Sequence, residues 1–363
     1  MIIRLNALDT LFFRDGKPFT MGEGSWASGS FPPAPSVFYG SLRTAYFARH
    51  PEDFNKANRP GDPTAALKIR GIYLQVGDQI CLPLPADCAG LNEERGKALL
   101  LRLANAPKAS SCPVPLVLES PAGEEVEAVE GGVLDCFSLI DYLNLKEEEF
   151  YYYKLSEFVL PEPKTGIGLN KITGTAQDHM LYRAAMWRLE SPVRTGSQNQ
   201  VVSFLVEFTG LNLPEKGILK LGGEGKAVYY ETLGPEEGES LFFAAPELRG
   251  GRFKLYLATP AMFAGGWLPG WLDEESLTGS YRGLGLRLLT AVTGKYISVG
   301  GFDMREKKPK VMHRAVPAGS VYYFELTGGD PGEVVKVFHR ANLSDYCPEQ
   351  GFGLTLVGGV GND

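Results

Sequence analysis

GSVYYFELTGGDPGEVVKVFHRANLSDYCPEQGFGLTLVG (residues 319–358) predicts a strand, a helix, a glycine loop and a second strand. Its aromatic opening is typical of a strand. Asp330 is placed to cap the helix, Pro331 suits the first helical position, and Glu333 provides the acid of a capping box. The apolar face of this helix comprises Val334, Val337, Phe338 and Ala341. Gly351-Phe352-Gly353 then leads into the last strand.

A similar order of elements is expected near the N-terminus. Residues 2–8 predict a strand, and Asp15-Gly16 marks a turn. A helix is expected from Ser36, which is placed as its N-cap, to the residue before Pro51. The stripe at helical spacing comprises Phe38, Leu42, Ala45, Tyr46 and Arg49. Arg43 falls on a different face of this helix, where it could reach a ligand.

Apolar and β-branched runs predict the remaining strands of the first half. Residues 67–85 predict two strands joined at Gly77-Asp78, and residues 201–210 predict another strand. Residues 214–233 predict one or two helical turns, a glycine loop at Gly222–Gly225 and a strand. The pattern is weaker between 86 and 160, which we interpret as an insertion.

Both halves close with a helix, a glycine loop and a strand, and this repetition decides the expected fold. The second half begins with a strand at 252–263, followed by extended or partly helical structure at 285–303. We predict an α+β chain of two ferredoxin-like (RRM-like) βαββαβ domains. The first would span residues 1–240, with the insertion at about 86–160 and a β-hairpin, and the second would span 241–363.

Composition favours a globular, cytoplasmic protein. At 363 residues the chain is long enough for two domains, and its 44 glycines and 25 prolines suit turns and bulges. The five cysteines include no Cys-x-x-Cys pair, and the four histidines add no metal-ligand spacing. We therefore expect reduced thiols and neither metal nor cofactor. The opening MIIRLNALDTLFFRDG places charges where a secretory signal is apolar, so neither a signal peptide nor a membrane span is expected.

Residues 164–190, KTGIGLNKITGTAQDHMLYRAAMWRLE, predict the extended hairpin. The alternating residues of its returning strand are Met180, Tyr182, Ala184 and Met186. Its charged residues are Lys164, Lys171, Arg183 and Arg188 against Asp178 and Glu190, with His179 beside them. A basic hairpin in a chain of 36 basic and 43 acidic residues indicates a polyanion site. The alternative is a solvated hairpin that covers a neighbouring sheet.

Residues 295–320 form a second basic region. Its cations are Lys295, Arg305, Lys307, Lys308, Lys310 and Arg314, its acids are Asp303 and Glu306, and Phe302, Met304 and His313 lie among them. Basic side chains follow a phosphate backbone while aromatic and apolar side chains stack on bases, so this mixture suits single-stranded RNA. The alternative is a mobile charged loop.

The glycine loops, His50 and the Gly328-Gly329-Asp330 turn raise the questions of phosphate binding, RNA cleavage and metal binding. The loops at Gly222–Gly225 and Gly351–Gly353 could offer backbone N–H groups to phosphate, or be simple turns, and neither is followed by the Gly-Lys-Ser/Thr of a P-loop. His50 could act in metal-free RNA cleavage but has no obvious catalytic partner. Gly328-Gly329-Asp330 is similar to a polymerase palm turn, but one aspartate cannot supply paired metal ligands.

Several segments of the chain resemble one family. These segments are FFRDGKPF with PPAPSVFYGSLRTA, KITGTAQDHMLY, LGGEGKA, TPAMFAGGWLP, GGFDMREKKPK with RAVPAGSVYYFEL, and GFGLTLVG. In this order, between residues 11 and 358, they resemble the RAMP-superfamily third subunit of the Cmr effector, the type III-B CRISPR complex. Residues 86–155 carry no such match.

The resemblance implies two ferredoxin-like domains, no catalytic activity, and binding of the repeat-derived 5′ tag of the CRISPR guide RNA. It also implies contacts with the large palm-containing subunit and with neighbouring backbone RAMP subunits. The hairpin would be a thumb-like element against the guide, and the two glycine loops would form a phosphate-facing floor. The alternatives are a RAMP-type metal-independent endoribonuclease that processes precursor RNA, and a protein-interaction scaffold whose acidic patches dock a basic partner.

The residues predicted to bind RNA come from the first helix, the hairpin, the glycine loops and the second basic region. They are Ser36, Arg43, Lys164, Lys171, Thr173, Gly174, Thr175, His179, Arg183, Gly222, Gly223, Arg305, Lys307, Lys308, Lys310, His313, Arg314, Gly351 and Gly353. The resemblance carries the hairpin and the glycine loops, whereas the residues from 302 to 314 are predicted from charge alone. We predict neither catalytic nor metal-binding residues.

Overall fold

Strand β1 (Ile2–Ala7) lies inside the largest sheet, antiparallel to β15 (Gln198–Thr209) on one side and β17 (Ala227–Thr232) on the other. Because side chains alternate along a strand, Ile3 and Leu5 enter the core that also holds the apolar side of helix α1 (Pro35–Arg49). The computed structural model describes residues 1–14, 26–91, 96–106, 113–123, 125–195, 198–234, 243–248, 250–303 and 308–361.

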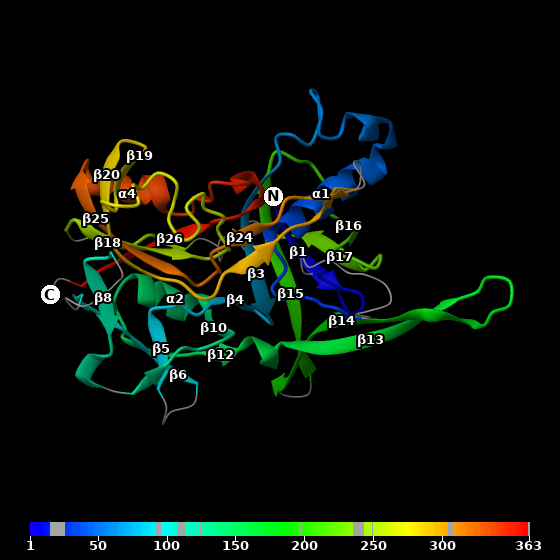
Figure 1. Cartoon of the computed structure of the whole chain (residues 1–363), viewed down its shortest axis with the longest axis horizontal. Helices are drawn as coiled ribbons and strands as arrows, with labels where there is room; N and C mark the ends of the chain where they lie inside the picture. Colours follow the sequence, from blue (N-terminus) through cyan, green and yellow to red (C-terminus); the bar gives the residue numbers. More distant parts are fainter. Residues whose placement is uncertain are drawn as a thin grey trace.

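Among the described residues, the largest sheet has eleven strands, most of which are labelled in Figure 1. Eight of them follow the spatial order β12 (Tyr153–Lys154), β10 (Gly132–Asp135), β4 (Gln79–Pro83), β3 (Lys68–Val76), β15, β1, β17 and β16 (Lys216–Lys220). The other three are β2 (Trp26–Ala27), β13 (Val159–Leu169) and β14 (Ala176–Thr195). The predicted turn at Gly77-Asp78 is confirmed, because β3 and β4 form a hairpin there and Gly77 has a φ of 58°.

Helix α1 begins and ends near the predicted residues, but its cap differs. Ala34 is the N-cap and makes no side-chain cap hydrogen bond, so the prediction that Ser36 caps the helix is wrong. Pro35 at the first position supplies the fixed φ of a helix start instead. Phe38, Leu42 and Ala45 are buried as predicted, whereas Arg49 is exposed. Pro51 ends the helix and opens the short 3-10 helix η1 (Pro51–Lys56).

A five-stranded sheet forms the core of the C-terminal half. Its order is β19 (Thr278–Tyr281), β20 (Leu284–Val292), β25 (Val321–Gly328), β18 (Arg252–Leu257) and β26 (Thr355–Gly359). Helix α4 (Pro331–Phe338) follows β25 as predicted, and the Asp330 carboxylate accepts a hydrogen bond from the Gly332 N–H at 2.9 Å. Glu333 accepts from Lys336 at 2.7 Å, so its predicted role in a capping box is wrong.

The two halves share one strand order but keep different helices. The orders β3-β15-β1-β17 and β20-β25-β18-β26 place the first and third strands of each half side by side. In the N-terminal half a helix joins the first two strands, and the helical turns predicted after residue 214 are instead strand β16. In the C-terminal half the helix joins the last two strands, and residues 258–277 contain no helix. The α+β class is confirmed, with strands predominating.

An arm of paired short strands leaves the C-terminal half after β20. Its strands are β21 (Ile297–Val299), β22 (Phe302–Asp303), β23 (Lys308–Pro309) and β24 (His313–Ala315). β21 pairs with β24, and β22 pairs with β23. The structure around residues 295–303 is therefore extended and not helical. Val299 and Ala315 at the base of the arm pack with Met262 and Phe352.

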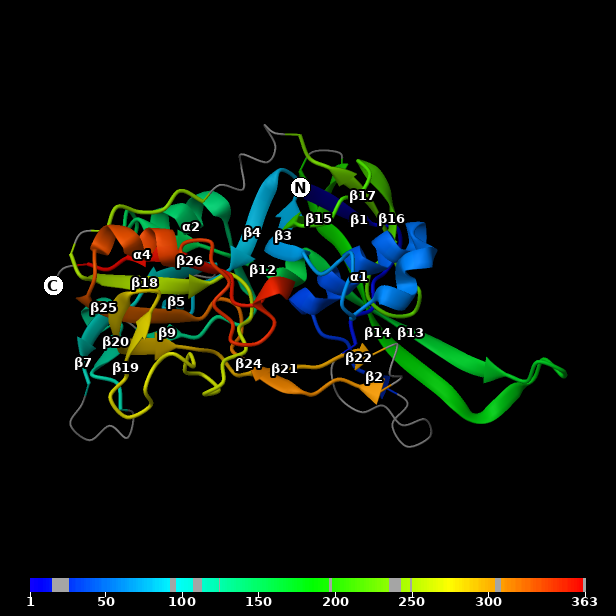
Figure 2. The same ribbon diagram turned by 90° about the horizontal axis from the view of Figure 1, so that it is seen from above.

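Residues 86–160 form more than an insertion in the first half. Their second sheet has the order β11 (Glu149–Tyr151), β6 (Lys97–Leu100), β5 (Cys88–Leu91) and β9 (Val126–Glu127). A separate pair comprises β7 (Arg102–Asn105) and β8 (Leu116–Glu119), and helix α2 (Cys136–Leu143) packs against β4 and β26. Besides η1, the part of the chain that the structure describes has the short 3-10 helices η2 (Pro121–Gly123), η3 (Leu155–Glu157) and η4 (Pro348–Gln350). In Figures 1 and 2 this region lies beside the C-terminal sheet.

A buried polar network joins this region to the C-terminal half. Asp87, which is 0 % exposed, accepts hydrogen bonds from the Tyr142 hydroxyl at 2.8 Å and the Tyr323 hydroxyl at 2.6 Å. Lys254, which is 1 % exposed, places Nζ 3.6 Å from the Asp87 carboxylate and 3.4 Å from the centre of the Tyr142 ring. Burial lowers the pKa of Lys254, and the Asp87 charge works against that shift. The network fixes the relative position of three separate segments.

Cysteines in the described residues form no disulfide. Cys81, Cys88 and Cys136 are buried and Cys347 is partly buried, and Cys112 lies outside the described residues. Burial raises the pKa of the Cys81 thiol to about 12, which keeps it protonated and unreactive. None of the described helices is both long and apolar enough to cross a membrane.

His339, just after α4, is expected to make folding stability fall in mild acid. Its Nε2 lies 2.7 Å from the Phe243 carbonyl oxygen, and Nδ1 accepts from the Val357 N–H at 3.2 Å, which requires the neutral ring. Burial lowers the pKa of His339 below 6.5. The unfolded chain therefore binds the proton at a higher pH, so stability is complete above about pH 6.5 and decreases below it.

Urea unfolding of the wild type and of His339→Gln between pH 5 and 7.5 measures this contribution. The wild type should lose more stability than the variant as the pH falls, because glutamine does not titrate. Equal pH dependence of the two proteins would contradict the assignment.

Candidate nucleic-acid interface

The predicted hairpin is present and longer than expected. β13 and β14 pair antiparallel from Val159 with Leu189 to Ile167 with Leu181, and the hairpin extends away from the body of the molecule (Figures 1 and 2). Gly166 lies opposite Tyr182, whose ring covers it, and a Cβ at Gly166 would come within 2.6 Å of that ring. Glycine there lets the aromatic side chain pack across the two strands.

The hairpin tip is a self-contained turn. The Asn170 side-chain oxygen accepts from the N–H groups of Ile172 at 2.9 Å and Thr173 at 3.2 Å, and the hydroxyls of Thr173 and Thr175 are 2.8 Å apart. Gly174 has a φ of 68°, which favours glycine. The Thr-Gly-Thr motif therefore shapes the turn. All three residues are exposed, so they are also accessible to a ligand.

Exposed aliphatic side chains accompany the cations of the hairpin. Ile172 at the tip is 95 % exposed, and Ile167 and Leu181 share the exposed face as a cross-strand pair. Lys171 is exposed and has no ionic partner among the described residues. Arg183 is exposed and lies opposite Thr165. Only the backbone of His179 belongs to the described residues, so its predicted RNA contact falls outside them.

At the root of the hairpin, two lysines meet one aspartate. Lys164 of β13 places Nζ 3.3 Å from the Asp9 carboxylate, and Lys226, at the end of the glycine loop, forms an ion pair with the same carboxylate. The Lys226 hydrogen bond holds the pKa of the Asp9 carboxyl well below its usual range. From Lys164, β13 continues five residues to Leu169, or about 17 Å, and Lys171 lies beyond it in the tip turn, so the hairpin cations form two separate groups.

The first glycine loop joins β16 and β17 at the surface. Gly222 is exposed with a φ of 81°, and a Cβ there would lie 2.3 Å from the Phe12 carbonyl oxygen. The Gly223 N–H donates to that same oxygen at 2.8 Å. Glycine at 222 is therefore required by the close passage of the segment that follows β1. The loop surface stays open beside Lys226.

The second glycine loop is placed differently. Gly351 and Gly353 are buried, and a Cβ on them would lie 2.8 Å from Ile69 and 2.4 Å from the Ser344 backbone nitrogen. Internal packing accounts for both glycines. The phosphate-facing role predicted for them is not supported, because their surface is covered by the protein itself.

The arm carries the second basic region. Lys308, Lys310 and Arg314 are exposed, and the Arg314 guanidinium carbon lies 4.7 Å from the centre of the Tyr296 ring. The ring of the adjacent residue, His313, lies 4.8 Å from the Tyr346 ring, tilted by 39°. Arg305 and Lys307 fall outside the described residues. The arm therefore presents cations next to two partly exposed tyrosines.

The two α1 residues predicted to bind RNA, Arg43 and Ser36, are less accessible than the exposed cations of the hairpin and the arm. Arg43 donates to Thr64 at 2.7 Å, Asn58 at 2.8 Å and Asp62 at 2.7 Å. Its guanidinium thus holds the 58–64 loop against the helix and is not available to a ligand in this arrangement. Ser36 lies in the first turn of α1 and is partly exposed.

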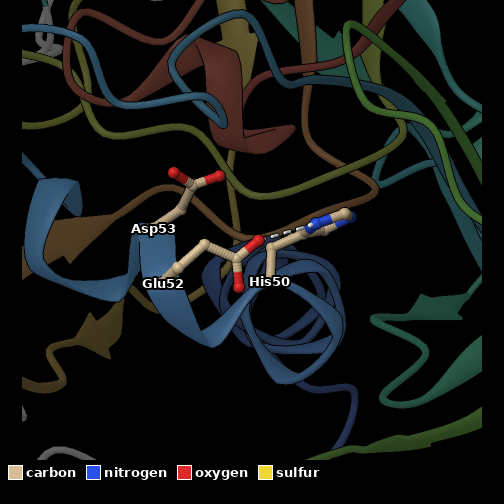
Figure 3. A group of neighbouring side chains, drawn as sticks. All are labelled: His50, Glu52 and Asp53. Atoms are coloured by element: carbon tan, nitrogen blue, oxygen red, sulfur yellow. Dashed lines mark ion pairs between the residues drawn. The ribbon is translucent and has the colours of Figure 1, made fainter.

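His50, Glu52 and Asp53 form a small exposed group after α1 (Figure 3). One ligand atom from each lies within 4.8 Å of the others, and His50 Nδ1 is 3.5 Å from Glu52. The Asp53 carboxylate is already neutralised by Lys56 at 2.6 Å, which leaves too little negative charge for tight binding of a divalent cation. The His50 ring also lies 4.5 Å from the Tyr46 ring, tilted by 31°.

Four residues of these surfaces were not predicted from the sequence: Asp9, Lys226, Tyr296 and Tyr346. Lys226 follows the Gly222–Gly225 loop directly, so extending that motif by one residue would have found it. Nothing local distinguishes Asp9, because its role depends on lysines more than 150 residues away.

The structure thus defines a strand-rich α+β protein with a projecting basic hairpin and a basic arm. The chain matches the family model of the CRISPR-associated protein (Cas_Cmr3) over residues 3–360, and it belongs to this family. The resemblance to the third subunit of the Cmr effector is confirmed by this match.

Solved structures show the same fold. A chain of the cryo-EM structure of the Type III-B Cmr-beta bound to cognate target RNA matches with a TM-score of 0.53 and 18% identity, covering 89% of this chain and 86% of that one. A chain of Cmr-beta bound to cognate target RNA and AMPPnP, state 1, matches with a TM-score of 0.52, at the same identity and coverage. A comparison with curated proteins found no match.

Proposed function

We propose that this chain is a non-catalytic, guide-RNA-binding subunit of a cytoplasmic type III-B effector. It holds the 5′ tag of the guide and bridges to the large palm-containing subunit and to neighbouring backbone subunits. The observation that carries the proposal is the projecting hairpin of a chain of this family, with exposed Lys171 next to the exposed side chain of Ile172 at its tip and exposed Arg183 nearer its root, opposite Thr165. The matched structures of Cmr-beta bound to target RNA support it.

The chemistry of the two surfaces suits single-stranded RNA. Lysine and arginine neutralise phosphates, and aliphatic side chains such as Ile172 can insert between bases. On the arm, Arg314 with Tyr296 and His313 with Tyr346 offer flat surfaces on which bases stack. RNA recognition of this kind needs positioning alone and no bond cleavage.

Two ferredoxin-like units best describe the scaffold of this function. The shared orders β3-β15-β1-β17 and β20-β25-β18-β26 support this description, with one of the two expected helices replaced in each half. The hairpin leaves the first unit next to β15, so its root is held by the largest sheet. A rigid root would allow an exposed hairpin to set the path of the RNA.

Charge reversal on the hairpin tests the proposal. Lys171→Glu with Arg183→Glu should weaken binding of tagged guide RNA by about tenfold or more at low salt. It should also reduce the slope of log affinity against log salt by about 1.4, since two fewer phosphates are neutralised. A fluorescence-anisotropy salt titration of the full chain measures both quantities.

The matched control is Lys146→Glu with Lys336→Glu, which changes the net charge equally on exposed residues outside the hairpin, after α2 and in α4. Equal loss of affinity in both pairs would show that net charge alone matters and remove the hairpin from the site. Tagged RNA incubated with the wild type in EDTA should remain intact. Cleavage that His50→Ala abolishes would overturn the non-catalytic role in favour of the endoribonuclease.

A further inference from the structure

The ion pairs at the root of the hairpin join three separate elements. Asp9 follows β1, Lys164 belongs to β13, and Lys226 ends the loop between β16 and β17. Both Lys164 Nζ and Lys226 Nζ lie within hydrogen-bond reach of the Asp9 carboxylate, whose side chain is 58 % exposed. Two ammonium groups therefore converge on one solvent-accessible pair of oxygens.

Asp9 is held in place by the backbone and does not depend on these lysines. The Leu8 N–H donates to the Ala227 carbonyl at 3.3 Å, and Leu11 exchanges two hydrogen bonds of 2.8 Å with Trp187. Phe12 accepts from Gly223 at 2.8 Å. The segment that carries Asp9 is thus fixed on one side to the glycine loop and on the other to β14.

The Asp9 carboxylate contacts the two lysines in the way that an RNA phosphate group would. Both groups are anions that present two oxygens to lysine ammonium groups. The side chains of Lys164 and Lys226 are 39 % and 17 % exposed, so a nucleic-acid backbone can reach both ammonium groups from solvent. Asp9 also accepts the Thr10 N–H at 2.7 Å, which pins the carboxylate between the two cations.

We propose that Lys164 and Lys226 form a binding site for one phosphate of the guide-RNA backbone, and that the Asp9 carboxylate occupies this site until RNA displaces it. The inference rests on the proposed function and assigns a specific phosphate contact to the hairpin root. Displacement costs the two ion pairs, so Asp9 weakens RNA binding and favours ligands that also engage the hairpin tip.

The alternative is an ordinary surface ion pair that only orients the hairpin. The two interpretations predict opposite effects of neutralising Asp9 on the affinity for RNA. If Asp9 merely orients the hairpin, its neutralisation loosens the root and weakens RNA binding. If Asp9 occupies a phosphate site, its neutralisation releases both lysines from this carboxylate, with Lys164 then 3.9 Å from Glu162, and strengthens RNA binding.

Asp9→Asn keeps the side-chain oxygen that accepts from Thr10 and removes the charge. In an anisotropy salt titration with tagged guide RNA, it should tighten binding by about three- to tenfold and steepen the salt dependence. Lys164→Met with Lys226→Met should weaken binding, since methionine retains the apolar stem. In that background Asp9→Asn should have no effect, which separates a local site from a general change in net charge.

Any other result of this titration contradicts the phosphate site at Lys164 and Lys226. Binding that Asp9→Asn leaves unchanged or weakens overturns it, and so does tightening that persists without the two lysines. RNA binding by the wild type remains in all these cases, so the proposed function survives them. Failure of the wild type to bind tagged RNA at low salt would overturn the proposed function and this site together.

Discussion

Replacing Asp87 with leucine is expected to lower the free energy of unfolding by about 3–5 kcal/mol, because it leaves Lys254 buried and unpaired. The hydroxyls of Tyr142 and Tyr323 would lose their acceptor at the same time. All of these groups lie in the core between residues 86–150 and the C-terminal sheet. Urea denaturation monitored by tryptophan fluorescence measures the loss.

Replacing both Asp87 and Lys254 should lower the free energy of unfolding less than replacing Asp87 alone. Asp87→Leu with Lys254→Met replaces the ion pair by apolar side chains of similar size, so this double variant should be more stable than Asp87→Leu alone. The comparison separates the cost of an unpaired buried charge from the value of the pair. A single variant within about 1 kcal/mol of the wild type would show that the network contributes little.

Gly353→Ala is expected to destabilise the protein by about 2–4 kcal/mol. The residue has a φ of 72°, which costs an alanine about 1 kcal/mol, and its Cβ would lie 2.4 Å from the Ser344 backbone nitrogen. The β26 end of the loop would have to shift, because a backbone atom cannot rotate away. The shift in the thermal unfolding midpoint and the urea midpoint would measure the effect.

Gly174→Ala at the hairpin tip is the matched control for this substitution. Gly174 has a similar φ of 68°, but a Cβ there meets nothing within 4 Å. Its cost should stay near 1 kcal/mol and be confined to the tip. If both variants lost equal stability, the steric contact at Gly353 would not be the cause. RNA binding of Gly353→Ala that is lost while folding is unchanged would restore the predicted phosphate role.

Helix α4 and the hairpin could both be predicted from local sequence. Asp330 and Pro331 define the start of α4 by capping and fixed φ, and both signals act within a few residues. The alternation around Tyr182 predicted a strand because side chains repeat every two residues. The RNA-binding hypothesis followed from the same hairpin, since its charges and its turn lie in one stretch.

Other site predictions concern residues whose partners lie far away in the sequence. Arg43 stands on the correct helix face, but the 58–64 loop folds back and occupies its guanidinium. The glycines at 351 and 353 were predicted to face phosphate, yet they allow close packing against Ile69 and Ser344. In both cases the contacts depend on which distant neighbour fills the space, which local patterns do not contain.

By itself the chain determined helices α1 and α4, the turn between β3 and β4, and the hairpin, because periodicity, helix-start signals and turn residues act over a few positions. It also determined the membership of the family and the concentration of positive charge in two segments. Only the tertiary structure decided that residues 86–160 pack with the C-terminal half through Asp87 and Lys254, and that Asp9 lies between two distant lysines. These contacts depend on how sheets meet in space, since burial and electrostatic pairing act between residues that the sequence places far apart.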